Sequence, residues 1–173
     1  AGAGVIRYTG EALSTATLNG DTGTPDILTY GDFTRLEVDL DNNRCPKNTK
    51  LITGSRMVDT KVVNAARYIY VGSELVPLLK EMSDPWGNKA LIEVAQYASA
   101  GTVARGEIGS IGSFRIIVVP EMLHWSGAGA TVGTNAGYRE TGGNYDVFPM
   151  LVVGDESFTT IGFQTSGSSK FKI

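Results

Sequence analysis

GEIGSIGSFRIIVVPEM, residues Gly106 to Met122, is the segment that says most about the fold of this chain. Its glycines at 106, 109 and 112 predict a segment of tight turns, because glycine adopts backbone angles that other residues avoid. The run that follows, FRIIVV at 114–119, is rich in β-branched residues, which favours a buried strand that ends at Pro120. The phosphate-loop pattern G-x-x-x-x-G-K-S/T is missing, so these glycines do not indicate a phosphate-binding loop.

The composition is typical of one globular domain. The chain has 173 residues, of which 42% are hydrophobic, and this is enough to form a core. The net charge of −3 and the pI near 5.2 indicate no basic face for nucleic acid. The one cysteine, Cys45, can neither close an internal disulfide nor complete a zinc site. Neither a membrane-spanning apolar run nor a signal peptide is recognisable, so we expect an aqueous setting compatible with a reducing cytoplasm.

The order of the expected elements indicates an α+β fold. Thr24 and Pro25 are typical of a helix start, and the spacing of apolar residues predicts a helix that runs to about Leu40. Further along, the pattern predicts strands at 67–71, 114–119, 147–153 and 157–163, and helices at 74–82 and 89–98. These elements predict a mixed, largely antiparallel sheet flanked by helices.

The chain divides into a lead-in, a domain and a tail. Residues 1–24 are rich in small and polar residues and predict an extended or mobile lead-in, residues 25–165 form the domain, and 166–173 are a short tail. Within the domain, the segment 126–145 holds six glycines and predicts a long loop. We expect this loop to make surface contacts rather than core contacts.

Residues that could support catalysis or metal binding are few. His124, the only histidine, could act with Ser126 and a carboxylate such as Asp146 as a hydrolytic set, but no G-x-S-x-G motif accompanies them. Asp39 and Asp41 could suggest a calcium loop, but the glycine and the glutamate that an EF-hand requires are missing. We therefore predict no enzyme activity, no metal site and no cofactor.

Several segments resemble a known family over nearly all of residues 5–165. They include DPWGN at 84–88, GEIG at 106–109, PEM at 120–122 and VVGD at 152–155. In their order and their residue identities these segments resemble the C-terminal part of tailed-phage major capsid proteins, the family typified by N4-like podoviruses.

The resemblance implies the Hong Kong 97-like capsid fold, mainly its axial domain with adjoining pieces of the peripheral domain. It implies a structural subunit of the virion that self-assembles with other capsid subunits into hexamers and pentamers of an icosahedral shell. Assembly would take place in the cytoplasm of the host bacterium, and contact with packaged DNA, if any, would be non-specific and made through phosphates. The arm, the extended loop and most of the spine helix of such proteins would lie upstream of residue 1.

In such a shell, exposed loops are expected to make the contacts between subunits. Trp86 and Tyr138 are large rings that can anchor an interface, and charged residues can pair at its rim. The candidates are Asp84, Trp86, Asn88, Arg105, Glu107, Tyr138 and Arg139. Trp86 could instead be a lid over the local core. A hydrolase that uses His124, and a non-viral binding module that uses the 126–145 loop, remain the alternative functions.

Overall fold

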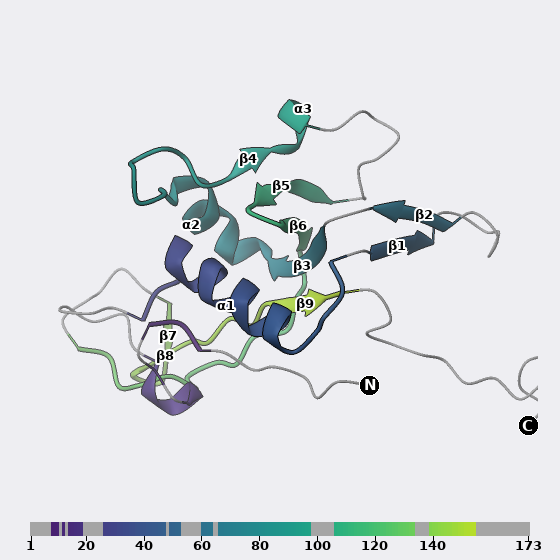
Figure 1. Cartoon of the computed structure of the whole chain (residues 1–173). Helices are drawn as coiled ribbons and strands as arrows, with labels where there is room; N and C mark the ends of the chain where they lie inside the picture. The colour runs from purple at the N-terminus through teal and green to yellow at the C-terminus, as the bar shows by residue number, and fades with distance from the viewer. Residues whose placement is uncertain are drawn as a thin grey trace, which may run out of the picture.

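A five-stranded mixed sheet with helices packed on one face forms the centre of the computed structural model (Figure 1). The structure describes residues 8–10, 12, 14–18, 26–47, 49–52, 60–63, 66–97, 106–133 and 139–154. The predicted strand at 157–163, the proposed helix start at Thr24–Pro25 and the 166–173 tail lie outside these residues.

The strands of the central sheet run in the order β4-β5-β6-β3-β9. The parallel pair β3–β6 lies inside the sheet, and the other three pairs are antiparallel, so the predicted mixed, largely antiparallel sheet is confirmed. The strands are β3 Arg67–Gly72, β4 Ile92–Glu93, β5 Glu107–Ile111, β6 Phe114–Val119 and β9 Leu151–Val153. The strand predicted at 147–153 is therefore shorter than expected, because Val147 pairs only with Trp125, in an isolated bridge.

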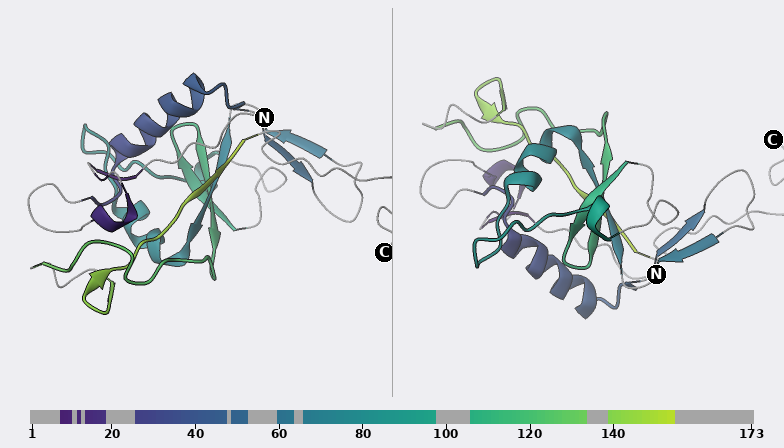
Figure 2. Two further views of the ribbon diagram at one scale, coloured as in Figure 1. Left: turned by 90° about the horizontal axis from the view of Figure 1, so that it is seen from below. Right: turned by 90° about the horizontal axis from the view of Figure 1, so that it is seen from above.

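One face of the sheet carries the core. Ile69 and Ile116 are opposite each other in the parallel pair, and both are fully buried. The helices α1 Tyr30–Asn42 and α2 Val76–Glu81 pack against this face; Phe33 of α1 has its ring 6.0 Å from that of Phe114, and Leu79 of α2 belongs to the same cluster. In both views of Figure 2 these two helices lie on the same side of the strands.

The helix α1 begins five residues later than predicted. Thr29 precedes it in an extended conformation and donates both its N–H and its hydroxyl to Asp32, each at 2.8 Å. This pairing provides the start signal that Thr24 and Pro25 were expected to give, and residues 26–29 are not helical.

The helix α1 ends in a left-handed turn at Arg44, whose φ is +55°. The N–H of Arg44 donates to the carbonyl of Asp41, and the N–H of Cys45 donates to the carbonyl of Leu40. These two bonds form a Schellman motif, in which glycine is the usual left-handed residue. The turn directs the carbonyls of Cys45 and Pro46 toward the start of β3.

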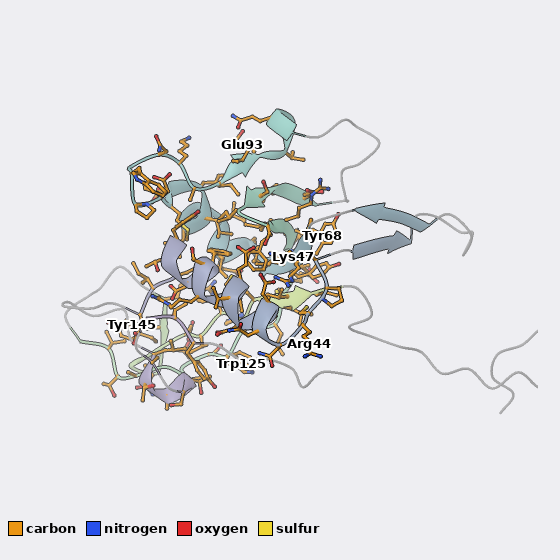
Figure 3. All side chains as sticks on the ribbon, in the orientation of Figure 1. Arg44, Lys47, Tyr68, Glu93, Trp125 and Tyr145 are labelled. Carbon is orange, nitrogen blue, oxygen red and sulfur yellow. The ribbon has the colours of Figure 1, made fainter. Side chains whose placement is uncertain are left out.

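Arg67, the first residue of β3, is fully buried and joins α1 to the sheet. Its guanidinium donates to Asp41 at 2.6 Å and to the carbonyls of Cys45 and Pro46. Lys47 adds ion pairs to Asp41 at 2.9 Å and to Glu37 at 3.1 Å, beside the end of α1 (Figure 3). The hydrogen bond from Arg67 and then that from Lys47 hold the pKa of Asp41 below its usual range.

Two sequence predictions around the edge of the sheet differ from the structure, the first of them in part. Gly106 and Gly112 lie in turns with positive φ, as expected, but the strand β5 runs between them, and its alternating buried positions include Glu107 and Ile111. The expected helix at 89–98 is replaced by β4 and by the four-residue helix α3 Val94–Tyr97. At Gly109 an added Cβ would lie 2.5 Å from the carbonyl oxygen of Ile92, so glycine is what lets β4 approach β5 this closely.

Among the described residues, two hairpins lie outside the central sheet. The segment 50–66, which the sequence leaves ambiguous, includes β1 Thr49–Ile52 and β2 Thr60–Val63. The expected long loop at 126–145 includes β7 Glu140–Thr141 and β8 Asn144–Tyr145, joined by Gly142 and Gly143 with positive φ. The 3-10 helices are η1 Thr15–Thr17, in the predicted lead-in, and η2 Ser73–Leu75, which leads directly into α2.

Ile116→Ala should lower the free energy of unfolding by roughly 2–5 kcal/mol, because it removes a fully buried side chain from the middle of the sheet. Ile92→Ala is the matched control: Ile92 is 47% exposed in the same sheet, and its loss should cost about 0.5 kcal/mol or less. Urea denaturation measures both, and equal losses would contradict the proposed core.

Asp41→Asn should make stability less dependent on pH in the acid range. Because the pKa of Asp41 is lowered in the folded chain, its carboxylate contributes stability above the unfolded pKa of about 3.9, and this contribution is lost as the pH falls through the lower folded value. Melting curves should therefore differ most between wild type and variant above about pH 4 and converge below it. Glu121→Gln, at an exposed acid, is the control. A constant difference at all pH values would contradict the ion pair.

Candidate functional site

The loop between α2 and β4 presents Trp86 on a closed turn. Asp84 Oδ1 accepts the N–H of Trp86 at 2.9 Å and the N–H of Asn88 at 2.8 Å, and the backbone N–H of Asp84 donates to the carbonyl of Asn88. Ser83 and Lys89 form a bridge that closes the base of the loop. The expected candidates Asp84, Trp86 and Asn88 thus belong to one hydrogen-bonded unit.

Asp84 is ionised to hold this turn. Burial by itself would raise the pKa of the carboxyl, but the hydrogen bonds from Asn88 and then from Trp86 outweigh it, and the pKa is lowered. The negative charge is therefore directed toward the N–H groups of the loop, and the indole is left outside.

Trp86 is 80% exposed, more than any other large hydrophobic side chain in the described part of the chain. The interpretation of Trp86 as a lid over the local core is therefore wrong. A large rigid ring on a preformed turn is suited to anchor an interface, because little conformational freedom remains to be lost on binding.

Glu107 does not have the position that an interface rim requires. Its side chain is fully buried, and it pairs with Arg115 at 3.6 Å on the sheet face opposite the helices. Tyr68 lies on the same face, and burial is the main reason that the pKa of its hydroxyl is raised. A rim residue needs an accessible side chain, so the burial of Glu107 contradicts its expected rim role. Two further candidates, Arg105 and Tyr138, lie outside the described residues.

Arg139 lies far along the chain from Trp86 and lines a separate surface groove. Its guanidinium pairs with Glu74 at 3.3 Å and lies over the ring of Phe148, 5.8 Å from the centroid. The side chain is still 57% exposed. Arg139 is thus an accessible charge held in place by an acid and an aromatic face.

The groove has a volume of about 330 Å³ and is open to solvent. Its lining is mostly apolar, and the charged residues in it are Asp26, Glu74, Arg139 and Asp146. The apolar lining residues include Leu18, Leu28, Leu75, Leu78, Phe148 and Met150. Sequence reasoning missed this groove, because the helical spacing of Leu75 and Leu78 was read as core packing. Figure 3 labels Tyr145, another lining residue, near β8.

The residues of the hydrolase alternative are only partly brought together. Ser126 Oγ lies 3.3 Å from His124 Nε2, and the His124 ring stacks on Phe148 with the centroids 5.2 Å apart. Asp146, however, accepts the N–H of Gly127 at 2.7 Å. Burial would raise the pKa of Asp146, but the bonds from Gly127 and Thr141 outweigh it and lower the pKa. The three side chains therefore do not form the serine–histidine–carboxylate chain that a hydrolase needs.

The described residues offer no cluster of three or more potential metal ligands among histidine, cysteine, aspartate and glutamate. Asp41, a candidate for a calcium loop, is used by Arg67 and Lys47 instead. Within the same residues, every helix is too short or too polar to cross a membrane.

The whole chain is similar to a phage structural protein. It is 50% identical over 173 residues to a protein named major capsid protein from Pseudomonas phage KPP21. The match covers 99% of this chain and 43% of that protein, so the chain spans less than half the length of this relative. No family model matches the sequence.

Asp84→Ala should open the Trp86 turn without unfolding the domain. The amide protons of Trp86 and Asn88 lose their shared acceptor and should exchange with solvent faster near neutral pH. Because the pKa of Asp84 is lowered, the difference from wild type should vanish as the pH falls through the folded pKa and the carboxylate is protonated. Hydrogen exchange by NMR measures this, and Glu81→Ala, at an exposed acid on α2, is the control. Unchanged exchange in Asp84→Ala would contradict the turn geometry.

Proposed function

We propose that this chain is part of a phage major capsid protein and serves as a structural subunit of the shell that encloses the phage genome. The observation that carries the proposal is the 50% identity to a major capsid protein along essentially the whole chain. At this level of identity over such a length, the two segments share a fold, and a role in the shell follows from it.

The geometry supports a role in assembly over catalysis. The most exposed large ring of the described residues is held on a preformed turn, an apolar groove with a charged edge lies elsewhere, and His124 lacks an oriented carboxylate. Shell subunits need such repeated surface contacts on a rigid frame, and they need no reactive centre.

We further propose the finer assignments that the sequence resemblance implies. The chain would be the C-terminal part of an N4-like capsid protein, with the Hong Kong 97-like fold and mainly its axial domain. Its subunits would form hexamers and pentamers in the cytoplasm of the host bacterium and end up in the virion. A sheet with helices on one face is compatible with this assignment. Contact with DNA would be made through phosphates and would be independent of base sequence.

The test is assembly of the capsid polypeptide that contains these residues. Expressed in bacteria, it should form closed particles or capsomer rings, which electron microscopy and sedimentation detect. A stable monomer at all concentrations would favour the binding-module alternative, and hydrolysis of model esters that is lost in His124→Ala would favour the enzyme.

Trp86→Ala should reduce particle yield about tenfold or more, while the melting temperature of the subunit changes little. The reason is that Trp86 contributes almost nothing to the core, being 80% exposed, but presents a large anchor. Sedimentation measures yield, and Leu123→Ala, at a side chain that is 73% exposed, is the matched control. A collapsed melting temperature with normal assembly of the surviving protein would contradict the interface role.

A further inference from the structure

Two surfaces of the described chain are complementary but do not meet within it. Trp86 projects from the loop after the end of α2, and the apolar groove is lined by Glu74, Leu75 and Leu78 at the start of η2 and α2. Since Trp86 is 80% exposed, it does not fill the groove of its own chain. In Figure 1 the loop between α2 and β4 is at the upper left, and the β7–β8 hairpin, which contributes Tyr145 to the groove, is at the lower left.

The groove matches an indole in size and lining. Its volume of about 330 Å³ is in the range of small-molecule pockets, and an indole needs a mostly apolar site with an acceptor for its N–H. Leu75, Leu78 and Met150 are among its apolar lining residues, and Glu74 and Asp146, which also line it, carry carboxylate acceptors. A tryptophan buried there would remove roughly 150–250 Å² from water.

The charges around the two surfaces are also complementary. Three acidic residues line the groove, Asp26, Glu74 and Asp146, against one basic residue, Arg139. Beside Trp86, the carboxylate of Asp84 is directed to N–H groups of the loop, and Lys89 at the base of the loop is exposed. A loop with an exposed cation therefore faces an acidic edge when the two surfaces meet.

We propose that Trp86 of one copy of this chain docks into the groove of the next copy. Because the Trp86 loop and the groove are different surfaces, the contact is heterologous, and each copy gives one tryptophan and receives one. Such contacts close into rings when the rotation between copies allows it. This inference rests on the proposed shell function and names the contact that would join neighbouring subunits of a capsomer.

Chemical cross-linking tests the contact directly. In a Cys45→Ser background, chains with Asn88→Cys are co-assembled with chains with Arg139→Cys and treated with a short bismaleimide. A cross-linked dimer between the two kinds of chain is expected. The control replaces Arg139→Cys with Val38→Cys, which lies on α1 and is 53% exposed but outside the groove, and it should give no dimer.

Fluorescence provides a second, independent readout. The chain has two tryptophans, so Trp125→Phe leaves Trp86 as the sole indole emitter. Its emission should shift to the blue when subunits assemble, because the ring leaves water. Glu74→Lys at the groove edge should lower capsomer yield about tenfold, whereas Glu81→Lys, exposed on α2 outside the groove, should not.

The outcomes separate this inference from the function on which it rests. Particles or rings that form while Trp86 emission stays that of a solvent-exposed indole, or that give no Asn88–Arg139 cross-link, overturn the docking and leave the capsid role standing. Unmodified protein that forms no oligomer overturns both. A cross-link between two Asn88→Cys chains, with none to Arg139→Cys, would indicate a symmetric contact and also overturn the docking.

Discussion

The buried guanidinium of Arg67 is the interaction on which the rest of this structure depends. It lies at the first residue of the central strand β3, next to the parallel partner β6, and its Nε and Nη2 atoms donate to Asp41 and to the carbonyls that follow α1, while the buried Nη1 has no hydrogen-bond partner. A buried cation without such partners is costly, so the end of α1 has to be at this point. Glu37 extends the network, since it accepts from both Lys47 and the Ser113 hydroxyl in the turn between β5 and β6. Helix, central strand and hairpin are thereby held by one set of charges.

The candidate contact surfaces are positioned by this frame without being part of it. α2 packs on the same sheet face through Leu79. This packing fixes the groove residues of η2 and of the start of α2, and it fixes the point from which the Trp86 loop leaves the helix. The loop adds its own constraint, since Asp84 accepts two backbone N–H groups and closes the turn locally. Rigidity of the two surfaces therefore comes from different sources, core packing for the groove and a local carboxylate for the loop. Substitutions in the loop should accordingly leave the core intact.

Sequence reasoning located the elements whose signal is local. The apolar runs at 67–71 and 114–119 predicted β3 and β6 nearly to the residue, because both strands are buried along most of their length. It missed β5, since Glu107 and Gly109 have low strand propensity and are placed there by a buried ion pair and by the close approach of β4. The β7–β8 hairpin had a usable signal, the Gly142–Gly143 pair, which the glycine content of the whole segment concealed. The groove had none, because its lining residues come from six separate parts of the chain.

A shell places a particular demand on its subunits, and the distribution of exposed groups here is consistent with it. Each contact in a closed ring or shell is repeated many times, so a single contact has to be weak enough for misplaced subunits to dissociate and still specific enough to exclude other geometries. One indole on a preformed turn suits the second condition, because Asp84 fixes the backbone from which the Trp86 ring projects. Charged residues at a rim suit the first, since exposed ion pairs contribute little and are screened by salt. In the proposed shell, specificity would then reside in shape and affinity in repetition.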